Sequence, residues 1–405
     1  MKMKPFIIIP AYRPDDRLPD LLREIQKQGL ENIIVVDDGS GPAYRPVFAL
    51  IETLGVTVVT HPENRGKGAA LRTGISAALQ AVSFENDAAV VTADADGQHA
   101  PEDIAAVAGA LMEHPDALIL GTRDFSLDHV PWKSRAGNRI SSVFFRLVTG
   151  KTCPDTQTGL RGIPSRLLPL ALEEEGDRYE YEMNFLTDAA PQAEIRQVPI
   201  RTIYENNNKG SHFHPFRDAV RVYARPLRFA AASLLSCGAD LLLFALFRSV
   251  LLKSNAFSGL SAAAFSASSA LSTAAAAFSS PDTLSTAAAV ILARLCSGGL
   301  NFTLNRKWSF RSNGKCAGEA VRYTALFVSV MAASALGTAL LSLLLPAGAA
   351  KILTDAVLFV LSYRAQKEWV FRKNKNTKEG LYHVQKNQSH PVRGLSHRLH
   401  DIHIA

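Results

Sequence analysis

The feature that most constrains this chain is a block of long apolar segments in its second half. Four of them are long enough to cross a bilayer, at residues of about 229–250, 286–305, 322–345 and 351–371. A membrane-spanning helix needs ~20 predominantly apolar residues. Residues 1–226 instead mix charged, polar and apolar residues, as a soluble α/β domain does. The sequence therefore predicts a soluble domain followed by an all-α, four-helix transmembrane domain.

An internal repeat runs through the apolar block with an offset of 61 residues, as between Trp308 and Trp369. Residues 305–311 align with residues 366–372, and both segments carry basic and aromatic residues after an apolar stretch. Such residues are typical of the cytoplasmic end of a membrane helix. We therefore expect a duplicated two-helix hairpin with both chain ends in the cytoplasm. A fifth span over the Ala- and Ser-rich residues 260–278 would invert the downstream topology and is the less favoured alternative.

Short apolar runs alternate with amphipathic stretches in the soluble half. Strands are predicted at residues 6–9, 33–36, 56–60, 88–92 and 117–120. Helices are predicted at residues 18–28, 68–81 and 102–112. Fully apolar strands between helices indicate a Rossmann-like, mixed and mostly parallel sheet that is covered on both faces. In such sheets, ligands bind beyond the carboxyl ends of the strands.

Acidic pairs follow two of the predicted strands. Asp94, Asp96 and Gln98 would place hard oxygen ligands on the same side of one loop. Such ligands favour Mg²⁺ or Mn²⁺, which usually bridge to substrate phosphates. Asp37 and Asp38 suit hydrogen bonds to ribose hydroxyls or to a base edge. Two acidic pairs at strand ends of one sheet therefore indicate a ligand site rather than two solvated turns.

Two other nucleotide-binding patterns and nucleic-acid binding are disfavoured. The segment Gly66-Lys67-Gly68 lacks the upstream Gly and the following Ser or Thr of a phosphate-binding loop. No G-x-G-x-x-G follows the first strand, which argues against a dinucleotide oxidoreductase. The chain has a net charge of +7, and much of the excess of basic residues lies beside the apolar runs and in the tail. No basic stripe interleaved with aromatic residues is present. The expected partner is therefore a membrane surface and not nucleic acid.

Seven short motifs follow one another in order over residues 6–161. They are IPAY at 9–12, VVDDGS at 35–40, NRGKGAA at 64–70, DADGQH at 94–99, GTR at 121–123, SRAGN at 134–138 and DTQTGLR at 155–161. This series resembles inverting family 2 glycosyltransferases, and most closely their dolichyl-phosphate mannosyltransferase and polyprenyl-phosphate glucosyltransferase branch. The resemblance implies a GT-A fold, a UDP- or GDP-sugar donor, and Mg²⁺ or Mn²⁺.

The resemblance also implies roles for individual residues. Donor-binding residues would be Pro10, Tyr12, Asp37, Asp38, Lys67, Asp94 and Gln157. Metal ligands would be Asp94, Asp96 and Gln98. Catalytic residues would be Arg123, Arg135, Asp155 and Arg161, and the acceptor phosphate would be bound by Ser134 and Arg135. The family's Asn-Glu after Pro-x-Tyr is Arg13-Pro14 here, so no role is carried over to these two positions.

The expected reaction is a direct displacement at the anomeric carbon, with inversion. A phosphate monoester acceptor has a second pKa of about 6, so it needs no general base. Asp155 is still the carboxylate expected nearest to the reaction centre, and the alternative is the segment Glu180-Tyr181-Glu182. His99 is expected to be structural and His61 to lie in a surface turn.

The membrane half resembles GtrA-like proteins, which are associated with the transfer or translocation of lipid-linked sugars. Asp240 and Arg294 lie at similar depth in the first two spans and are expected to pair, because isolated charges are costly there. The expected organisation is a GT-A domain at 1–211, a basic interfacial linker at 212–226, the membrane domain at 227–372 and a disordered basic tail at 373–405.

The predicted function is therefore transfer of a hexose to a polyprenyl phosphate at the cytoplasmic face of the inner membrane. The protein would be multi-pass, with its catalytic domain and both termini cytoplasmic, and a homo-oligomer is left open. The alternative is a flippase or transport component with a regulatory nucleotide-sugar domain. The intact Asp94-Ala95-Asp96-Gly97-Gln98 segment favours the enzyme. Processive polysaccharide synthesis is disfavoured because residues 162–226 lack a Gln-x-x-Arg-Trp motif.

Overall fold

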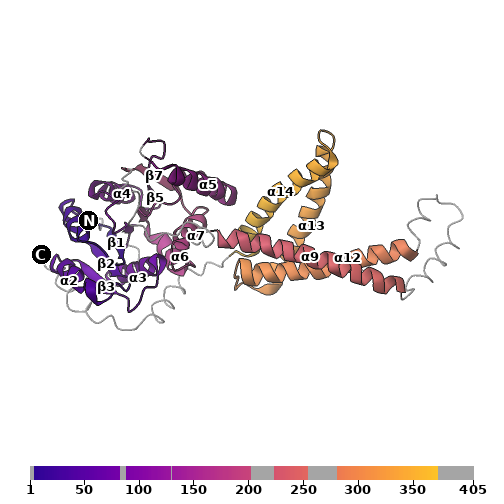
Figure 1. Cartoon of the computed structure of the whole chain (residues 1–405), viewed down its shortest axis with the longest axis horizontal. Helices are drawn as coiled ribbons and strands as arrows, with labels where there is room; N and C mark the ends of the chain where they lie inside the picture. The colour runs from indigo at the N-terminus through magenta and orange to yellow at the C-terminus, as the bar shows by residue number, and fades with distance from the viewer. Residues whose placement is uncertain (1–3, 83–87, 129, 202–222, 254–280, 373–405) are drawn as a thin grey trace. The chain divides into compact units, whose positions relative to one another are not determined.

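The computed structural model describes residues 4–82, 88–128, 130–201, 223–253 and 281–372 (Figure 1). Described residues up to 201 belong to one compact unit, and those from 223 to 372 belong to a second. Most of the predicted linker at 212–226 and all of the predicted tail at 373–405 lie outside the described residues. The boundaries of these two segments therefore stay predictions.

The first unit is built on a seven-stranded sheet with the order β3-β2-β1-β4-β6-β5-β7. Its strands are β1 (Phe6–Ala11), β2 (Ile33–Asp37), β3 (Thr57–Thr60), β4 (Val90–Thr92), β5 (Leu118–Thr122), β6 (Arg161–Ile163) and β7 (Ile195–Pro199). β6 pairs antiparallel with both of its neighbours, and the other strand pairs among the described residues are parallel. The predicted mixed, mostly parallel sheet is thereby confirmed, and its five predicted strands are present. β6 and β7 were not predicted.

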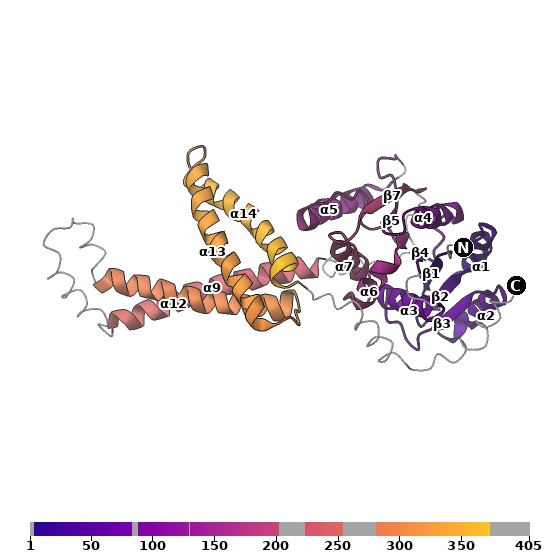
Figure 2. The same ribbon diagram turned by 180° about the vertical axis from the view of Figure 1, so that it is seen from behind.

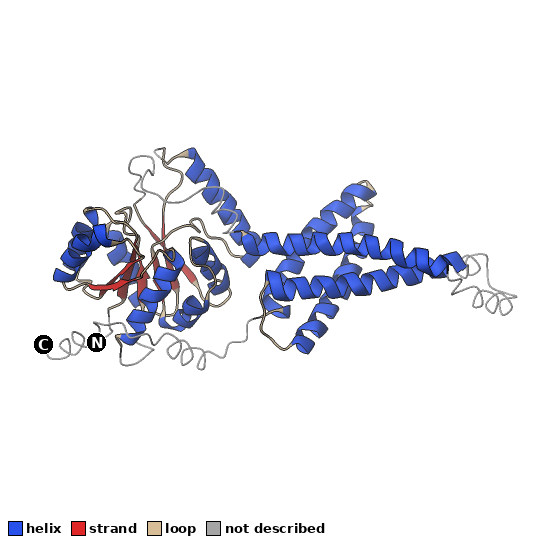
Figure 3. Ribbon diagram, turned by 60° about the horizontal axis from the view of Figure 1, so that its bottom comes forward, coloured by secondary structure: helices blue, strands red, loops and turns tan. Residues whose placement is uncertain are grey.

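Helices cover both faces of the sheet, as Figure 3 shows. They are α1 (Arg17–Lys27), α2 (Arg45–Thr53), α3 (Lys67–Gln80), α4 (Pro101–Glu113), α5 (Trp132–Thr149), α6 (Leu168–Glu173) and α7 (Glu180–Ala189), with short 3-10 turns at Pro42–Tyr44 and Ser165–Leu167. The side chains of β1 alternate between the faces, since Ile8 joins the core under α3, α6 and α7 whereas Ile7 and Ile9 join the core under α1, α2 and α4.

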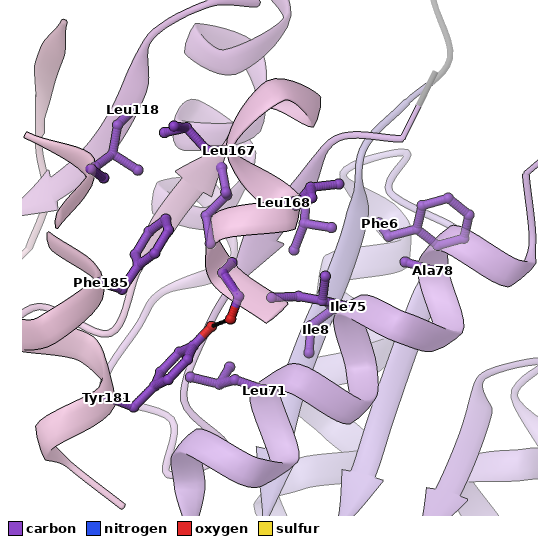
Figure 4. Packing of buried hydrophobic residues seen from close by; sticks show 14 of the residues in the cluster. Phe6, Ile8, Leu71, Ile75, Ala78, Leu118, Leu167, Leu168, Tyr181 and Phe185 are labelled. Atoms are coloured by element: carbon purple, nitrogen blue, oxygen red, sulfur yellow. Dashed lines mark hydrogen bonds between the residues drawn. The ribbon is translucent and has the colours of Figure 1, made fainter. Parts of the chain in front are cut away.

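The core under α3 and α7 contains one buried hydroxyl. Tyr181 of α7 lies beside Leu71 of α3, and its hydroxyl donates to the carbonyl oxygen of Ala171 at 2.7 Å (Figure 4). This bond satisfies the hydroxyl, which is the only polar group of the side chain, so α7 can pack closely on α3 and α6. Burial raises the pKa of Tyr181 well above its ordinary value, which keeps the donor protonated.

The second unit consists of two helix pairs, which are visible from both sides in Figures 1 and 2. α9 (Ala224–Lys253) packs along α12 (Pro281–Leu304), and α13 (Cys316–Leu341) packs along α14 (Ala347–Ala365). The four helices coincide with the four predicted spans. Within the described part of the chain, α9 and α13 have the length and hydropathy of membrane spans. That α12 and α14 also cross the membrane stays a prediction.

The sequence repeat is visible in the packing of the two helix pairs. α12 is followed by a π-helix at Asn305–Ser309, and α14 by a second π-helix at Gln366–Val370, at the same offset of 61 residues. The rings of Phe302 and Phe371 lie 5.8 Å apart, and those of Phe310 and Tyr363 lie 5.7 Å apart. A shift of 61 residues relates Phe302 to Tyr363 and Phe310 to Phe371. Each of the two ring contacts is therefore the counterpart of the other in the repeat. The two copies therefore pack about an approximate two-fold axis.

Candidate functional site

The carboxyl ends of β1, β2 and β4 meet at one edge of the sheet. Ala11 of β1 lies opposite Asp37 of β2, and Ile8 of β1 lies opposite Thr92 of β4. Because the three strands are parallel, the segments after Ala11, Asp37 and Thr92 leave the sheet on the same side. The fold thereby gathers the predicted donor-binding clusters at one edge.

Lys67 is the central cation of this edge. Its Nζ lies 2.6 Å from Asp94 Oδ1 and 3.1 Å from Glu182 Oε1, and all three side chains are partly buried. Burial lowers the pKa of Lys67, but the two carboxylates outweigh burial and raise it above its usual range. Burial raises the pKa of Asp94, but Lys67 outweighs burial and holds it at about 2. Lys67 and Asp94 are therefore both charged at neutral pH.

Glu182 belongs to this charged group but is not among the predicted site residues. The segment Glu180-Tyr181-Glu182 was weighed only as an alternative source of a base. Two acidic residues in the first turn of a helix are normally explained by the helix dipole, so no local signal separates Glu182 from Glu180. Only the packing of α7 against α3 brings Glu182 to Lys67.

The glycines on either side of Lys67 allow α3 to approach α7 closely. Gly66 has a φ of +102°, and a Cβ there would lie 2.3 Å from the carbonyl oxygen of Asp177. A Cβ on Gly68 would lie 2.6 Å from Cβ of Tyr181. These glycines therefore serve the packing that positions Lys67.

The loop after β4 presents the predicted metal ligands. The side chain of Asp96 is exposed, and its Oδ1 accepts a hydrogen bond from the backbone N–H of Gln98 at 3.0 Å. Asp94 N–H donates to Nδ1 of the buried His99 at 3.1 Å, and burial lowers the pKa of His99. A neutral ring can accept this bond, which fits the expected structural role of His99. Among the described residues, no three His, Cys, Asp or Glu side chains form a metal-binding group.

Asp155 binds Arg123, and its expected place nearest to the reaction centre stays a prediction. It is fully buried, and both of its carboxylate oxygens bind Arg123: Oδ2 lies 2.8 Å from Nε and Oδ1 lies 3.0 Å from Nη2. Its Oδ1 also accepts the N–H of Gln157 at 3.1 Å, while the Gln157 side chain is exposed. Bidentate binding of this kind fixes the guanidinium in one orientation. Asp155 therefore positions Arg123, which follows β5.

The side chain of Arg161 makes its contacts inside the soluble unit, and the catalytic role expected for it stays a prediction. It is buried, and its guanidinium donates to the carbonyl oxygens of Thr158 at 2.9 Å and Glu182 at 2.6 Å. These bonds join the 155–161 loop to α7. Arg161 is thus a structural cross-link that holds Glu182 near Lys67.

Asp38 and His61 form a buried hydrogen-bonded pair beside the loop that precedes Lys67. Asp38 is buried, and its carboxylate accepts bonds from Nδ2 of Asn64 at 3.0 Å and from the N–H of Gly66 at 2.7 Å. Nδ1 of His61 lies 2.8 Å from Asp38 Oδ1. The prediction of a surface turn for His61 is wrong, because the ring is buried. Asp38 therefore shapes the loop before Lys67, and the donor-binding role expected for it stays a prediction.

The remaining predicted residues lie around the same sheet edge or on α5. Pro10 and Tyr12 are partly buried at the end of β1, and Asp37 Oδ1 accepts the N–H of Ser40 at 2.8 Å. Ser134 and Arg135 lie in the first turn of α5, where Arg135 Nη2 donates to the carbonyl oxygen of Leu127 at 3.1 Å.

Gly159 links the 155–161 loop to Asp94 and gives a first prediction. A Cβ at this position would lie 2.5 Å from Asp94 Oδ2. We expect Gly159→Ala to displace the Asp94 carboxylate and to lower the transfer rate about 10²-fold, as misplaced catalytic groups do. Gly109→Ala on α4 is the matched control, because a Cβ there meets nothing within 4 Å. Equal rates for both variants would show that Asp94 does not need its present position.

The expected charge pair in the membrane unit has the geometry of an ion pair. Arg294 Nε lies 3.5 Å from Asp240 Oδ2, and Ser297 Oγ donates to Asp240 Oδ1 at 2.8 Å. Each single neutralisation, Asp240→Asn or Arg294→Gln, should lower the yield of folded protein in detergent more than the double change does. Additive losses in this double-mutant cycle would mean that the two charges are not coupled.

The chain combines an α/β unit, which has a charged site at the ends of its parallel strands, with apolar helical hairpins. This combination defines a membrane-associated enzyme that acts on a polar ligand. Residues 6–168 match the family described as glycosyl transferase family 2, and residues 256–371 match the GtrA/DPMS transmembrane domain. The chain belongs to glycosyl transferase family 2 and carries a GtrA/DPMS transmembrane domain. It is therefore a glycosyltransferase and a membrane protein.

Three relatives show where the similarity lies. An uncharacterized protein of Methanocaldococcus jannaschii is 32% identical over 204 residues, which are 49% of this chain and 81% of the relative. The UDP-N-acetylglucosamine–dolichyl-phosphate N-acetylglucosaminyltransferase of Methanococcus voltae is 31% identical over 218 residues, 49% of this chain and 85% of the relative. The polyprenol monophosphomannose synthase of Mycolicibacterium smegmatis is 27% identical over 169 residues, 40% of this chain and 62% of the relative.

A solved structure overlaps the chain more loosely. The glucosyl-3-phosphoglycerate synthase from Mycobacterium tuberculosis, in complex with Mn²⁺, UDP-glucose and phosphoglyceric acid, has a TM-score of 0.41 and 18% identity. The overlap covers 57% of this chain and 79% of the synthase.

Proposed function

We propose that this protein transfers a hexose-type sugar, with inversion, from a nucleotide-diphosphate donor to a polyprenyl phosphate at the cytoplasmic face of the inner membrane. The names of the Methanococcus voltae and Mycolicibacterium smegmatis relatives include a dolichyl-phosphate and a polyprenol product, which supports this acceptor class. The observation that carries the proposal is the charged group of Lys67, Asp94 and Glu182 beside the ends of β1, β2 and β4.

Two cationic side chains are proposed to stabilise the leaving nucleoside diphosphate. Lys67 and Arg123 are each held by a carboxylate, so their charges are fixed before the donor binds. Both positive charges lower the pKa of Asp94, which supports their action in one common site. Fixed charges that face a developing negative charge are an effective source of rate enhancement.

A divalent cation fits the loop after β4. Asp94, Asp96 and Gln98 would hold Mg²⁺ or Mn²⁺, and Asp96 is exposed enough to do so. Mg²⁺ is usually bound by one or two carboxylates together with substrate phosphates, so a two-carboxylate set is sufficient when the donor is present. When bound, the cation neutralises charge on the donor diphosphate.

The acceptor is proposed to react without a protein base. Its phosphate is largely a dianion at neutral pH because the second pKa of such a group is about 6. The engagement of Asp155 by Arg123 supports this, since both oxygens of that carboxylate already accept hydrogen bonds from the guanidinium. Ser134 and Arg135 in the first turn of α5 are proposed to bind the acceptor phosphate, where a helix N-terminus adds favourable backbone N–H groups.

Membrane vesicles that contain the full chain test this function. They are incubated with polyprenyl phosphate, Mg²⁺ or Mn²⁺, and radiolabelled UDP-N-acetylglucosamine, UDP-glucose or GDP-mannose. We expect label in the organic phase from one donor, its loss with Asp96→Ala or a chelator, and an inverted anomeric configuration in the product. If folded protein binds nucleotide but transfers no label from any donor, the enzyme proposal fails and the flippase alternative is favoured.

The proposed topology places the soluble unit and both termini in the cytoplasm. The segment between α12 and α13 supports this orientation, because it and the adjacent helix ends carry Arg306, Lys307, Arg311, Lys315 and Arg322. Cysteines introduced at exposed positions of α1 and of this segment should react with a membrane-impermeant maleimide only after the cells are opened.

A further inference from the structure

Two buried amide side chains occupy equivalent positions in the two copies of the membrane repeat. Asn305 is the first residue of one π-helix, and Gln366, 61 residues later, is the first residue of the other. Asn305 is fully buried and Gln366 is 4% exposed. π-Helices are rare and occur frequently at functional sites. A buried amide at the start of both π-helices therefore indicates a function that the two copies share.

The nitrogen of each amide is satisfied in the same way, whereas the oxygen is not. Asn305 Nδ2 donates to Asn301 Oδ1 at 2.7 Å. Gln366 Nε2 donates to Ser362 Oγ at 3.1 Å, and Ser362 is the counterpart of Asn301 in the repeat. Neither Asn305 Oδ1 nor Gln366 Oε1 has a hydrogen-bond donor among the residues that the structure describes. Buried polar atoms nearly always have a partner, so each of these oxygens needs a donor.

The orientation of the Asn305 amide is fixed by its neighbours. The hydroxyl of Tyr323 also donates to Asn301 Oδ1, at 2.7 Å. Asn301 Oδ1 thus accepts two hydrogen bonds, and Asn305 must turn its nitrogen toward it. A rotation that exchanged the nitrogen and oxygen of Asn305 would bring two carbonyl oxygens together. The oxygen of Asn305 is therefore the atom that needs a donor.

The two amides lie in the segments through which the copies touch, residues 302–310 and 363–371. The rings of Phe310 and Phe371, which the repeat relates to each other, lie 5.2 Å apart. A contact between equivalent residues places the approximate two-fold axis between them. The backbone N–H of each of these two residues donates to the carbonyl oxygen of the amide residue five positions earlier, at 2.8 Å in both copies. Both amides are therefore close to the axis, on opposite sides of it.

Two conditions limit what can bind between the amides. The ligand must be small, because the aromatic rings beside them touch at centroid separations of 5.2 Å, 5.7 Å and 5.8 Å. It must also be neutral, because Arg228 and Arg322 bring positive charge to the same place. Their guanidinium groups donate to backbone carbonyl oxygens near the ends of the two π-helices, at 3.4 Å and 2.9 Å. This charge disfavours Na⁺ and K⁺.

We propose that one water molecule binds on the approximate two-fold axis of the membrane unit and donates one hydrogen bond to Asn305 Oδ1 and one to Gln366 Oε1. Water is small and neutral, and its two O–H groups are themselves related by a two-fold axis. It therefore matches two acceptors that the repeat relates. Buried waters typically bind polar groups that have no other partner and are costly to remove. This water would join the two copies of the repeat where α12 and α14 end.

A double-mutant cycle tests whether the two oxygens share one ligand. Unfolding of the full chain in detergent is measured for Asn305→Leu, for Gln366→Met and for both changes together. Each single change leaves the water with one acceptor, and we expect it to raise the unfolding equilibrium constant about 10-fold. The double change removes both acceptors together with the water. It should raise the constant by about 10-fold again, and not by the ~100-fold of two independent losses.

A second cycle is the matched control. Asn305→Leu is combined with Ser362→Ala, which removes the partner of the Gln366 nitrogen and leaves the Gln366 oxygen in place. The losses in this cycle should multiply, because Ser362 does not contact the shared ligand. Multiplying losses in the first cycle as well would show that Asn305 and Gln366 are not linked.

Radiolytic labelling detects the water in the unmodified protein. An X-ray pulse converts bound water into hydroxyl radicals, which oxidise the side chains beside it. We expect label on Phe371, which is 3% exposed, and none on Phe185, which is 1% exposed and packs in the core of the soluble unit. The label on Phe371 should disappear in the Asn305→Leu, Gln366→Met double variant.

Two further outcomes overturn the proposal. Equal, background labelling of Phe371 and Phe185 would show that the axis holds no water. A melting temperature that falls when Na⁺ and K⁺ are replaced by choline at constant ionic strength would assign the site to a monovalent cation. None of these measurements uses transfer activity, so they stand apart from the proposed function.

Discussion

A Lys67→Met variant is expected to lose about 10²–10³-fold in transfer rate, the range seen when one preorganised charge-stabilising group is removed. Lys67 Nζ is within 3.1 Å of both Asp94 and Glu182, so its removal leaves two partly buried carboxylates without their common cation. The variant should also lose about 2–3 kcal/mol of unfolding free energy, less than the ~3–5 kcal/mol for a fully buried pair because Asp94 is partly exposed. Initial rates and thermal unfolding in the same detergent measure both effects.

The pH dependence of this variant has a defined sign. Lys67 holds the pKa of Asp94 at about 2, below its ordinary value of 3.8, so the ion pair contributes stability that is complete above pH 3.8 and disappears as pH falls toward 2. Without Lys67, burial dominates and the pKa of Asp94 rises. Asp94 should therefore take up its proton at a higher pH in Lys67→Met than in the unmodified protein, as carboxylate infrared bands would report.

Two controls separate charge from geometry at this position. Lys67→Arg keeps the positive charge and should retain more activity than Lys67→Met. Glu182→Gln removes one carboxylate but leaves the Lys67–Asp94 pair, and should lower the rate by a smaller factor than Lys67→Met. Transfer by Lys67→Met within threefold of the unmodified rate would show that this cation is not part of the working site.

The second large effect is expected for Asp155→Asn. It removes the buried carboxylate that binds Nε and Nη2 of Arg123, so Arg123 is no longer fixed. Breaking a buried ion pair by removing one partner typically costs about 3–5 kcal/mol. We expect a loss of this size in unfolding free energy together with about a 10²-fold loss in transfer rate, because the freed guanidinium is no longer preorganised.

A double variant separates the stability of the buried pair from its role in transfer. Arg123→Met combined with Asp155→Leu replaces the pair by apolar side chains and should recover much of the stability lost in Asp155→Asn. It should recover none of the activity, because Arg123 itself is gone. Transfer by Asp155→Asn at the unmodified rate would show that Arg123 does not need this carboxylate.

The sheet and the membrane helices were predictable because each is formed by an apolar segment that is continuous in sequence. β1, β2 and β5 are continuous apolar runs, and α9 and α13 are longer than a bilayer requires. β6 was missed because its three residues contain a Gly between Arg161 and Ile163. α5 was missed as a helix because its exposed side carries apolar residues, so the usual alternation of a buried apolar face and an outer polar face is absent.

The candidate site was predictable in composition but not in the role of each member. The motifs predicted ligand-binding or catalytic roles for Asp38 and Arg161, and the fold adds that Asp38 binds the loop before Lys67 and that Arg161 binds the backbone of α7. Glu182 became part of the site only through α7. The motifs identify the charged residues of the site, but they do not show which of these residues form ion pairs with one another in the folded protein.

The sequence by itself determined that this protein has a mostly parallel α/β unit of glycosyl transferase family 2 and a GtrA/DPMS membrane unit, because period, apolar length and ordered motifs are local properties. The tertiary structure decided which cation each carboxylate meets. Lys67 lies between Asp94 and Glu182, and Arg123 binds Asp155, across separations in sequence that no local pattern encodes. Because electrostatic interactions depend on distance and burial, the working charges of the site were fixed only when the chain folded.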